Sequence, residues 1–232
     1  MKLECKNALV HPSGKEDEFV LGPINLSIEP GLITGLVGRN GSGKTTLLRL
    51  LSGRLMPEEG SVQTGEGRIS YVGGKMGDWL IRKPDSLADA VAVFEPWFDK
   101  PFLETRMRRL GLQMDEEPDS FTSAGKKMYL LLFELARKPD ILLLDEPTSG
   151  LPPAMRHEAL DLLQEYMEDE KHSLVFSTHI TADLDRVADR IVLLDDGQIR
   201  LDEEKEAVKL RMRVPGEALP SIAEIMGRFS GQ

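Results

Sequence analysis

The sequence is poor in cysteine and has no long apolar run. With Cys5 as the only cysteine among 232 residues, neither a disulfide within the chain nor a cluster of cysteine ligands for a metal can form. A reducing cytoplasm is the simplest compartment for such a chain. The most apolar stretches, YLLLFELA and DILLLDEP, are much shorter than the ~20 residues that a membrane-spanning helix needs. The first residues carry charges throughout, unlike a signal peptide, so we expect a chain that does not itself cross a membrane.

Basic charge is also scarce. The chain has 29 Lys and Arg against 39 Asp and Glu, a net charge of −10. Nucleic-acid-binding proteins favour a basic surface, so we expect no nucleic-acid partner. The composition, 41% hydrophobic and 29% charged, is typical of a globular protein. A length of 232 residues allows one well-buried core, so we expect a single domain over residues 1–232.

The apolar pattern indicates an α/β fold. Strands are predicted within residues 1–37 and at 68–72, and a strand, a glycine-rich turn and a leucine-rich helix ending at Gly53 follow one another from residue 32. The continuous apolar runs at 140–145, 173–178 and 190–199 are typical of parallel strands buried on both faces. Between about residues 73 and 138 the pattern favours short amphipathic helices. The charged run DEEKE, which starts at Asp202, is expected to face solvent.

The segment GRNGSGKT, residues 38–45, fits the pattern G-x-x-x-x-G-K-[ST] of a phosphate-binding loop. Its glycines let the backbone fold around phosphate oxygens, and its N–H groups and the start of the next helix attract the anion. Lys44 is expected to reach the β- and γ-phosphates and the Thr45 hydroxyl to bind Mg²⁺. The candidate nucleotide-binding residues are Gly38, Arg39, Asn40, Gly41, Ser42, Gly43, Lys44, Thr45 and Thr46.

Two adjacent carboxylates follow the apolar run ILLL. Carboxylates at the end of a buried strand need a partner, and a nucleotide with its metal supplies one. Asp145 suits a role in binding Mg²⁺, and Glu146 suits the orientation or deprotonation of an attacking water. His179 ends the predicted strand SLVFST and is expected to hydrogen-bond the γ-phosphate and that water.

These motifs, in this order, resemble the nucleotide-binding subunit of an ATP-binding cassette (ABC) transporter. GRNGSGKTT resembles the Walker A loop of that family, ILLLDEPTSGL its Walker B strand, catalytic glutamate and D-loop, and STH its switch histidine. The resemblance implies a P-loop NTPase core, residues 1–72 and 139–232, with a mostly parallel sheet and N-terminal antiparallel strands. It also implies an inserted helical subdomain at about 73–138. ATP and Mg²⁺ would be the cofactors, with catalytic roles for Glu146, His179 and Lys44.

The resemblance also implies partners. Two such subunits, identical or different, close head to tail on two ATP molecules, and integral membrane permease subunits hold them at the inner face of the cell membrane. We expect the chain to power transport through such separate permease subunits. The alternatives are an ABC-type ATPase that acts on the ribosome or on DNA, and a regulatory subunit with low turnover.

Three motifs depart from the family pattern. FTSAGKKM stands where the family has LSGGQ, and we refer to residues 121–128 as the signature segment. We expect Ser123 and Gly125 to contact the γ-phosphate, although the usual spacing to Asp145 would select Thr122 and Ala124 instead.

The strand that the family ends in glutamine reads Gly73-Gly74 here, so that role is lost or is taken by a side chain such as Lys75. Pro152 replaces the aspartate that helps to couple the two ATP sites, which predicts weaker coupling. His11 and Phe19 are the candidates for stacking on adenine. The signature and the strand end together favour export over import.

Overall fold

The computed structural model of the chain describes residues 1–12, 19–73 and 82–229. Its centre is a sheet in the order β5-β6-β7-β3-β8-β9. The pairs from β5 to β8 are parallel and β9 runs antiparallel to β8. The strands are β3 (Ile33–Val37), β5 (Ile69–Val72), β6 (Ile141–Asp145), β7 (Ser173–Ser177), β8 (Arg190–Asp195) and β9 (Gln198–Glu204). The predicted mostly parallel sheet is therefore confirmed.

The continuous apolar runs of the strands arise because both faces of this sheet are covered. In β6, Leu142 and Leu144 pack into one hydrophobic core, whereas Ile141 and Leu143 pack into the other. Successive side chains of a strand point to opposite faces, so a strand between two cores must be apolar at every position.

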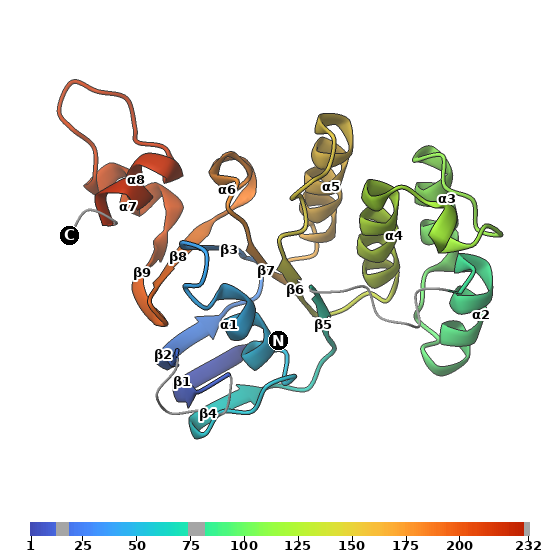
Figure 1. Cartoon of the computed structure of the whole chain (residues 1–232), viewed down its shortest axis with the longest axis horizontal. Coiled ribbons are helices and arrows are strands. Elements are labelled where there is room, and N and C mark those ends of the chain that lie inside the picture. The colour runs from blue at the N-terminus through green and yellow to red at the C-terminus, as the bar shows by residue number, and fades with distance from the viewer. Residues whose placement is uncertain (13–18, 74–81, 230–232) are drawn as a thin grey trace.

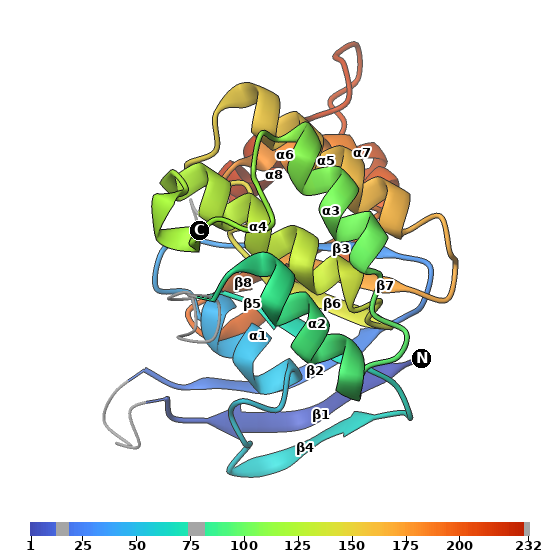
Figure 2. The same cartoon turned by 90° about the vertical axis from the view of Figure 1, so that its right-hand side faces the viewer.

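One core lies between the central sheet and a second, antiparallel sheet (Figure 2). This second sheet has the order β2-β1-β4, and it confirms the N-terminal antiparallel strands. Helix α1 (Lys44–Leu51) lies between the two sheets, and its leucines at positions 47, 48, 50 and 51 are buried there. The strands are β1 (Leu3–Val10), β2 (Leu21–Ile28) and β4 (Glu59–Thr64). The sequence did not predict β4, because EGSVQT shows no apolar alternation and none of its residues is fully buried.

Helices cover the opposite face of the central sheet (Figure 1). Here lie α5 (Pro153–Tyr166), α6 (Thr181–Val187), α7 (Lys205–Arg211) and α8 (Ile222–Phe229). Beside them stands the helical segment predicted between the core strands, with α2 (Pro84–Phe94), α3 (Lys100–Arg109), the 3-10 helix η2 (Pro118–Ser120) and α4 (Ser123–Ala136). Tyr129 and Phe133 anchor α4, since both side chains are fully buried and their rings meet edge to face.

The predicted strand over residues 190–199 is in fact a hairpin. Asp196 and Gly197 have φ angles of 45° and 71°, the left-handed conformation that a two-residue hairpin turn requires. The chain therefore reverses, and β9 pairs with β8 as an antiparallel edge strand. The charged run from Asp202 ends β9 and begins α7, and its side chains are half-buried or exposed. Among the described residues, no helix is both long and apolar enough to span a bilayer.

Candidate nucleotide site

The carboxyl ends of three parallel strands bring the predicted site residues together. The glycine-rich loop 38–43 follows β3, Asp145 ends β6 and Glu146 follows it, and His179 lies two residues beyond β7. Because β6, β7 and β3 are neighbours in the sheet, these groups converge at one edge. This edge is the usual ligand site of open parallel sheets.

The glycine-rich loop has the geometry of a phosphate cradle. Gly43 has a φ of 104°, and a Cβ atom there would lie 2.8 Å from Cζ of Phe19, so both the backbone and the space require glycine. Helix α1 begins at the next residue and directs its positive end at the loop. The cavity at this point has a volume of about 440 Å³, and its lining residues are Pro12, Phe19, Asn40, Gly41, Gly43, Lys44, Thr45, Thr46, Asp145 and Glu146.

The Lys44 ammonium group is folded onto the cradle itself. Its Nζ atom donates hydrogen bonds to the carbonyl oxygens of Gly38 at 2.8 Å and Arg39 at 3.0 Å. Burial lowers the pKa of Lys44, while the negative charges of Glu146 and Asp145 act to raise it. A phosphate in the cradle would offer this ammonium group a stronger, charged acceptor than two carbonyl groups.

The candidate Mg²⁺ ligands lie side by side. The Thr45 hydroxyl donates to Oδ2 of Asp145 at 2.7 Å, and the Ser177 hydroxyl donates to Oδ1 of the same carboxylate at 2.5 Å. A hydroxyl and a carboxylate are hard oxygen donors, which suit an ion that takes its remaining ligands from water and phosphate. Thr45 and Asp145 therefore fit Mg²⁺. The sequence analysis missed Ser177, which the pairing of Asp145 with Ser177 across β6 and β7 places here.

Glu146 and His179 form a direct pair. Nδ1 of His179 lies 2.8 Å from Oε2 of Glu146, and since a carboxylate only accepts, the imidazole is the donor. The backbone of Glu146 has a φ of 53°, which is uncommon for a residue with a side chain. Its N–H group donates to both the carbonyl oxygen and the hydroxyl of Ser177, each at 3.1 Å. These bonds hold the strand end in the conformation that turns the carboxylate toward His179.

The turn after Glu146 is anchored by a buried network that the sequence did not reveal. The Thr148 hydroxyl donates to Oδ2 of Asp183 at 2.6 Å, and Arg156 donates to Oδ1 of the same carboxylate at 2.6 Å. Thr148 and Asp183 are almost completely buried. The network therefore joins the turn to α5 and to α6, the helix that starts just after His179. Pro152 is the N-cap residue of α5 and Pro153 its first residue, a position at which proline costs no hydrogen bond.

The signature segment starts α4. Thr122 is the N-cap residue, and its hydroxyl accepts a hydrogen bond from the Gly125 N–H group at 3.1 Å. Ser123 is the first helical residue, and both hydroxyl-bearing side chains are exposed. The Gly125 N–H group, which was expected to contact phosphate, is thus already paired with Thr122. The hydroxyl at the N-cap position of α4 belongs to Thr122 and not to Ser123.

Gly73 leaves no room for a side chain. A Cβ atom there would lie 2.4 Å from the Tyr71 hydroxyl oxygen and 2.6 Å from Cβ of Asp145. A glutamine could not replace Gly73 without moving Tyr71 and the end of β6 that carries Asp145. Gly74 and Lys75, the other residues considered for this role, lie outside the described residues.

The two candidates for stacking on adenine differ in position. Phe19 lines the cradle cavity. His11 instead forms a hydrogen bond between its Nδ1 atom and Oε2 of Glu58 at 2.8 Å, and it does not line that cavity. Phe19 is the better placed of the two.

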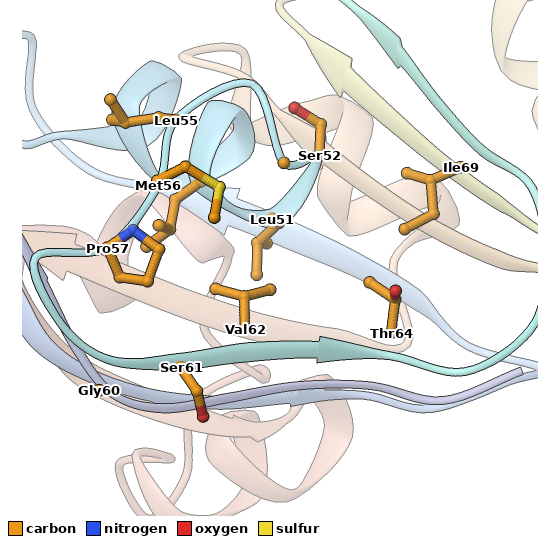
Figure 3. Close-up of a pocket in the computed structure, with 12 residues that line it drawn as sticks. Leu51, Ser52, Leu55, Met56, Pro57, Gly60, Ser61, Val62, Thr64 and Ile69 are labelled. Carbon is orange, nitrogen blue, oxygen red and sulfur yellow. The ribbon is translucent and has the colours of Figure 1, made fainter.

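A second pocket, of about 470 Å³, lies between the end of α1 and β4 (Figure 3). Leu51, Leu55, Met56 and Val62 surround it, and none of its lining residues belongs to the loop 38–45. It lacks the phosphate-binding groups of the cradle, so it is not the nucleotide site.

Residues 21–149 match the family model described as ABC transporter. The chain belongs to the ABC transporter family. It is 31% identical to the ABC transporter ATP-binding protein YtrB of Bacillus subtilis over 83% of this chain and 71% of that protein. It is 27% identical to the thiamine import ATP-binding protein ThiQ of a Chelativorans species, over 95% of this chain and 92% of that protein.

Solved ABC transporter subunits share the fold. An ATP-binding subunit of an ABC transporter superposes with a TM-score of 0.83 at 20% identity, covering 99% of this chain and 100% of that one. A dimeric ATP-binding cassette, solved after hydrolysis with ADP and phosphate bound, gives a TM-score of 0.70 at 22% identity over 87% of this chain and 98% of that one. The P-loop NTPase fold class predicted from the sequence is confirmed.

As a member of the ABC transporter family, the chain is an ATP-binding subunit and an ABC-type ATPase. The export direction expected from the signature segment and the strand end is not supported, because the thiamine relative and an aliphatic sulfonates relative of Pseudomonas aeruginosa are both named for import. The reason is physical as well. Binding and hydrolysis of ATP are the same chemistry for either direction, so no residue of the cradle encodes the direction.

Proposed function

We propose that this chain hydrolyses ATP with Glu146 as the group that orients and activates the attacking water. The observation that carries the proposal is the pair formed by Glu146 and His179 beside the cradle. In this arrangement His179 holds the carboxylate through Nδ1, which leaves Nε2 to face the γ-phosphate or the water. Lys44 would neutralise charge on the β- and γ-phosphates, and Phe19 would stack on adenine. Mg²⁺, held by Thr45 and Asp145, would neutralise charge that develops on the phosphate oxygens.

The test of this proposal is steady-state ATPase activity together with ATP binding. Lys44→Ala should abolish nucleotide binding, whereas Glu146→Gln should keep binding and lose turnover. If Glu146→Gln turned ATP over at the wild-type rate, the proposed role of the carboxylate would be wrong.

The second part of the proposal is a dimer, of two copies or with a related subunit, in which the signature segment of one subunit faces the cradle of the other. The exposed start of α4 supports it, and the dimeric cassette solved with ADP and phosphate is a precedent among similar structures. Ser123 and Gly125 are the residues first expected at the phosphate. The N-cap position of Thr122 favours that hydroxyl instead. Light scattering of the Glu146→Gln variant with ATP tests dimer formation, and Thr122→Val and Ser123→Ala distinguish the two hydroxyls.

The third part is a permease partner at the inner face of the membrane. Val93 and Phe94 at the end of α2 are 74% and 83% exposed, and Trp97 nearby is 43% exposed. Large apolar side chains grouped on a surface in this way mark a protein contact. We propose that they pack against a membrane subunit, and that Phe94→Asp abolishes co-purification with it while leaving the basal ATPase rate unchanged. By analogy with the thiamine import relative, the transport is import. Uptake of a panel of labelled nutrients by cells that carry Lys44→Ala tests the direction.

A further inference from the structure

Lys127 connects α4, the helix that the signature segment starts, to the turn that carries Glu146. It lies on α4, four residues after Ser123, and its Nζ atom donates to the carbonyl oxygens of Glu146 at 3.0 Å and Ser149 at 2.6 Å. The first carbonyl group belongs to the residue proposed to activate water, and the second lies three residues further along the same turn. These are contacts between segments that are 19 and 22 residues apart in the sequence.

The surroundings of the Lys127 ammonium group have opposing effects on its pKa, and burial is the larger of them. Burial lowers the pKa of Lys127, while Glu146 and Asp145 act in the opposite direction. A charged donor forms a stronger hydrogen bond to a carbonyl oxygen than a neutral donor does. Lys205 makes a comparable contact elsewhere in the fold, because its Nζ atom at the start of α7 donates to the carbonyl oxygen of Asp185 on α6 at 3.0 Å. The two lysines therefore provide a matched pair for comparison.

The two peptide groups that flank the Glu146 side chain are held by two different elements, β7 and α4. Ser177 of β7 accepts from the Glu146 N–H group, and Lys127 of α4 donates to the Glu146 carbonyl oxygen. Between these contacts the backbone adopts its left-handed φ of 53°, a conformation that persists only when the surroundings impose it. The direction of the carboxylate toward His179 depends on that conformation.

We infer that Lys127 is a positioning residue for ATP hydrolysis. Its contacts fix the backbone of Glu146 relative to α4, so a movement of α4 moves that backbone. The inference rests on the proposed role of Glu146. Within one subunit, the Lys127 contact connects the start of α4, the surface proposed to meet the partner subunit, with the Glu146 carboxylate.

The test is the ATPase kinetics of the full chain with substitutions at the two lysines. Lys127→Met keeps the aliphatic stem and removes the ammonium group. We expect kcat to fall about tenfold or more, since small misplacements of a reacting group are costly, while KM for ATP changes less than about twofold. Lys127→Arg, which keeps a charged donor, should recover most of kcat. Lys205→Met, which removes a comparable lysine contact outside the signature segment and the cradle, should leave both constants unchanged.

A double substitution separates this inference from the proposed function. If Lys127 acts through Glu146, then Lys127→Met adds no further loss to Glu146→Gln, whereas independent effects would multiply. A deficient Glu146→Gln with a fully active Lys127→Met would overturn the inference alone. A fully active Glu146→Gln would overturn the proposed function first. If Lys127→Met does not fold, Lys127→Gln, whose amide donors are neutral, is compared with Lys127→Arg, and equal kcat values for the two would also overturn the inference.

Discussion

The imidazole of His179 donates from Nδ1 to Oε2 of Glu146 over 2.8 Å, although 33 residues separate them in the sequence. Both residues stand just beyond neighbouring strands, and the Glu146 side chain is 29% exposed while that of His179 is 57% exposed. The pair is thus open toward the cradle, so a water molecule and a phosphate can reach it. Its chemistry leads to the first prediction.

Glu146→Gln should lower kcat about 100-fold or more, because an amide cannot accept the proton of the attacking water. ATP binding should persist, since Lys44 and the cradle are untouched. The rate of phosphate release measures kcat, and titration with a fluorescent nucleotide measures ATP binding. Glu146→Asp is the control, and it should keep part of the activity because it keeps the carboxylate.

The buried contact between Thr148 and Asp183 should stabilise the fold measurably. Thr148→Val leaves one oxygen of a buried carboxylate without its hydroxyl donor, which costs about 1–3 kcal/mol of the free energy of unfolding. Urea denaturation checks this. Ser149→Ala, in the same turn, is the matched control and should cost less than about 0.5 kcal/mol. Equal losses for the two variants would show that the Thr148 hydroxyl contributes nothing specific.

Burial should make stability depend on the Cys5 thiol at high pH. Desolvation raises the pKa of Cys5 from 9.0 to about 11 in the folded chain. Above pH 9 the unfolded thiol loses its proton while the folded thiol keeps it, so stability falls as pH rises from about 9 to about 11. The contribution is about 1.4 kcal/mol for each pH unit in that window.

Cys5→Ala lacks this contribution, so its stability should fall less steeply above pH 9 than that of the wild type. Lysine and tyrosine titrations are common to both proteins and cancel in the comparison. Parallel slopes of the two curves would contradict the prediction. Urea unfolding at half-unit pH steps gives both curves.

Pro152→Asp should increase the cooperativity of ATP hydrolysis. The substitution supplies the carboxylate that the family resemblance leads us to expect at this position, and aspartate is also a favourable N-cap residue for α5. The expected result is a higher Hill coefficient for ATP, with a gain in helix stability of up to about 1 kcal/mol. Pro152→Ser, which caps the helix without the charge, separates the two effects. If both the rate and the Hill coefficient of Pro152→Asp matched the wild type, Pro152 would not limit coupling.

Local sequence patterns were sufficient for the elements of the core. The run ILLL in β6 is apolar at every position because cores lie on both faces, and that periodicity is visible without coordinates. The phosphate-binding loop is also recognised locally, since its glycines, Lys44 and Thr45 all lie within residues 38–45. Strand β4 was not evident, because an edge strand needs no continuous apolar run. The hairpin of β8 and β9 does have a local signal, the polar pair Asp196-Gly197 at its turn, which the prediction of one strand over residues 190–199 overlooked.

By itself, the sequence determined the chemistry of this protein: a cradle for phosphate, two carboxylates after a buried strand, and a histidine after another. These follow from residue type and short spacing. The tertiary structure decided which groups touch. Only strand order places Ser177 on Asp145, and only the packing of α4 and α6 against the core brings Lys127 and Asp183 to the turn after Glu146. Contacts between residues far apart in sequence depend on how whole elements pack, and no local pattern encodes that packing.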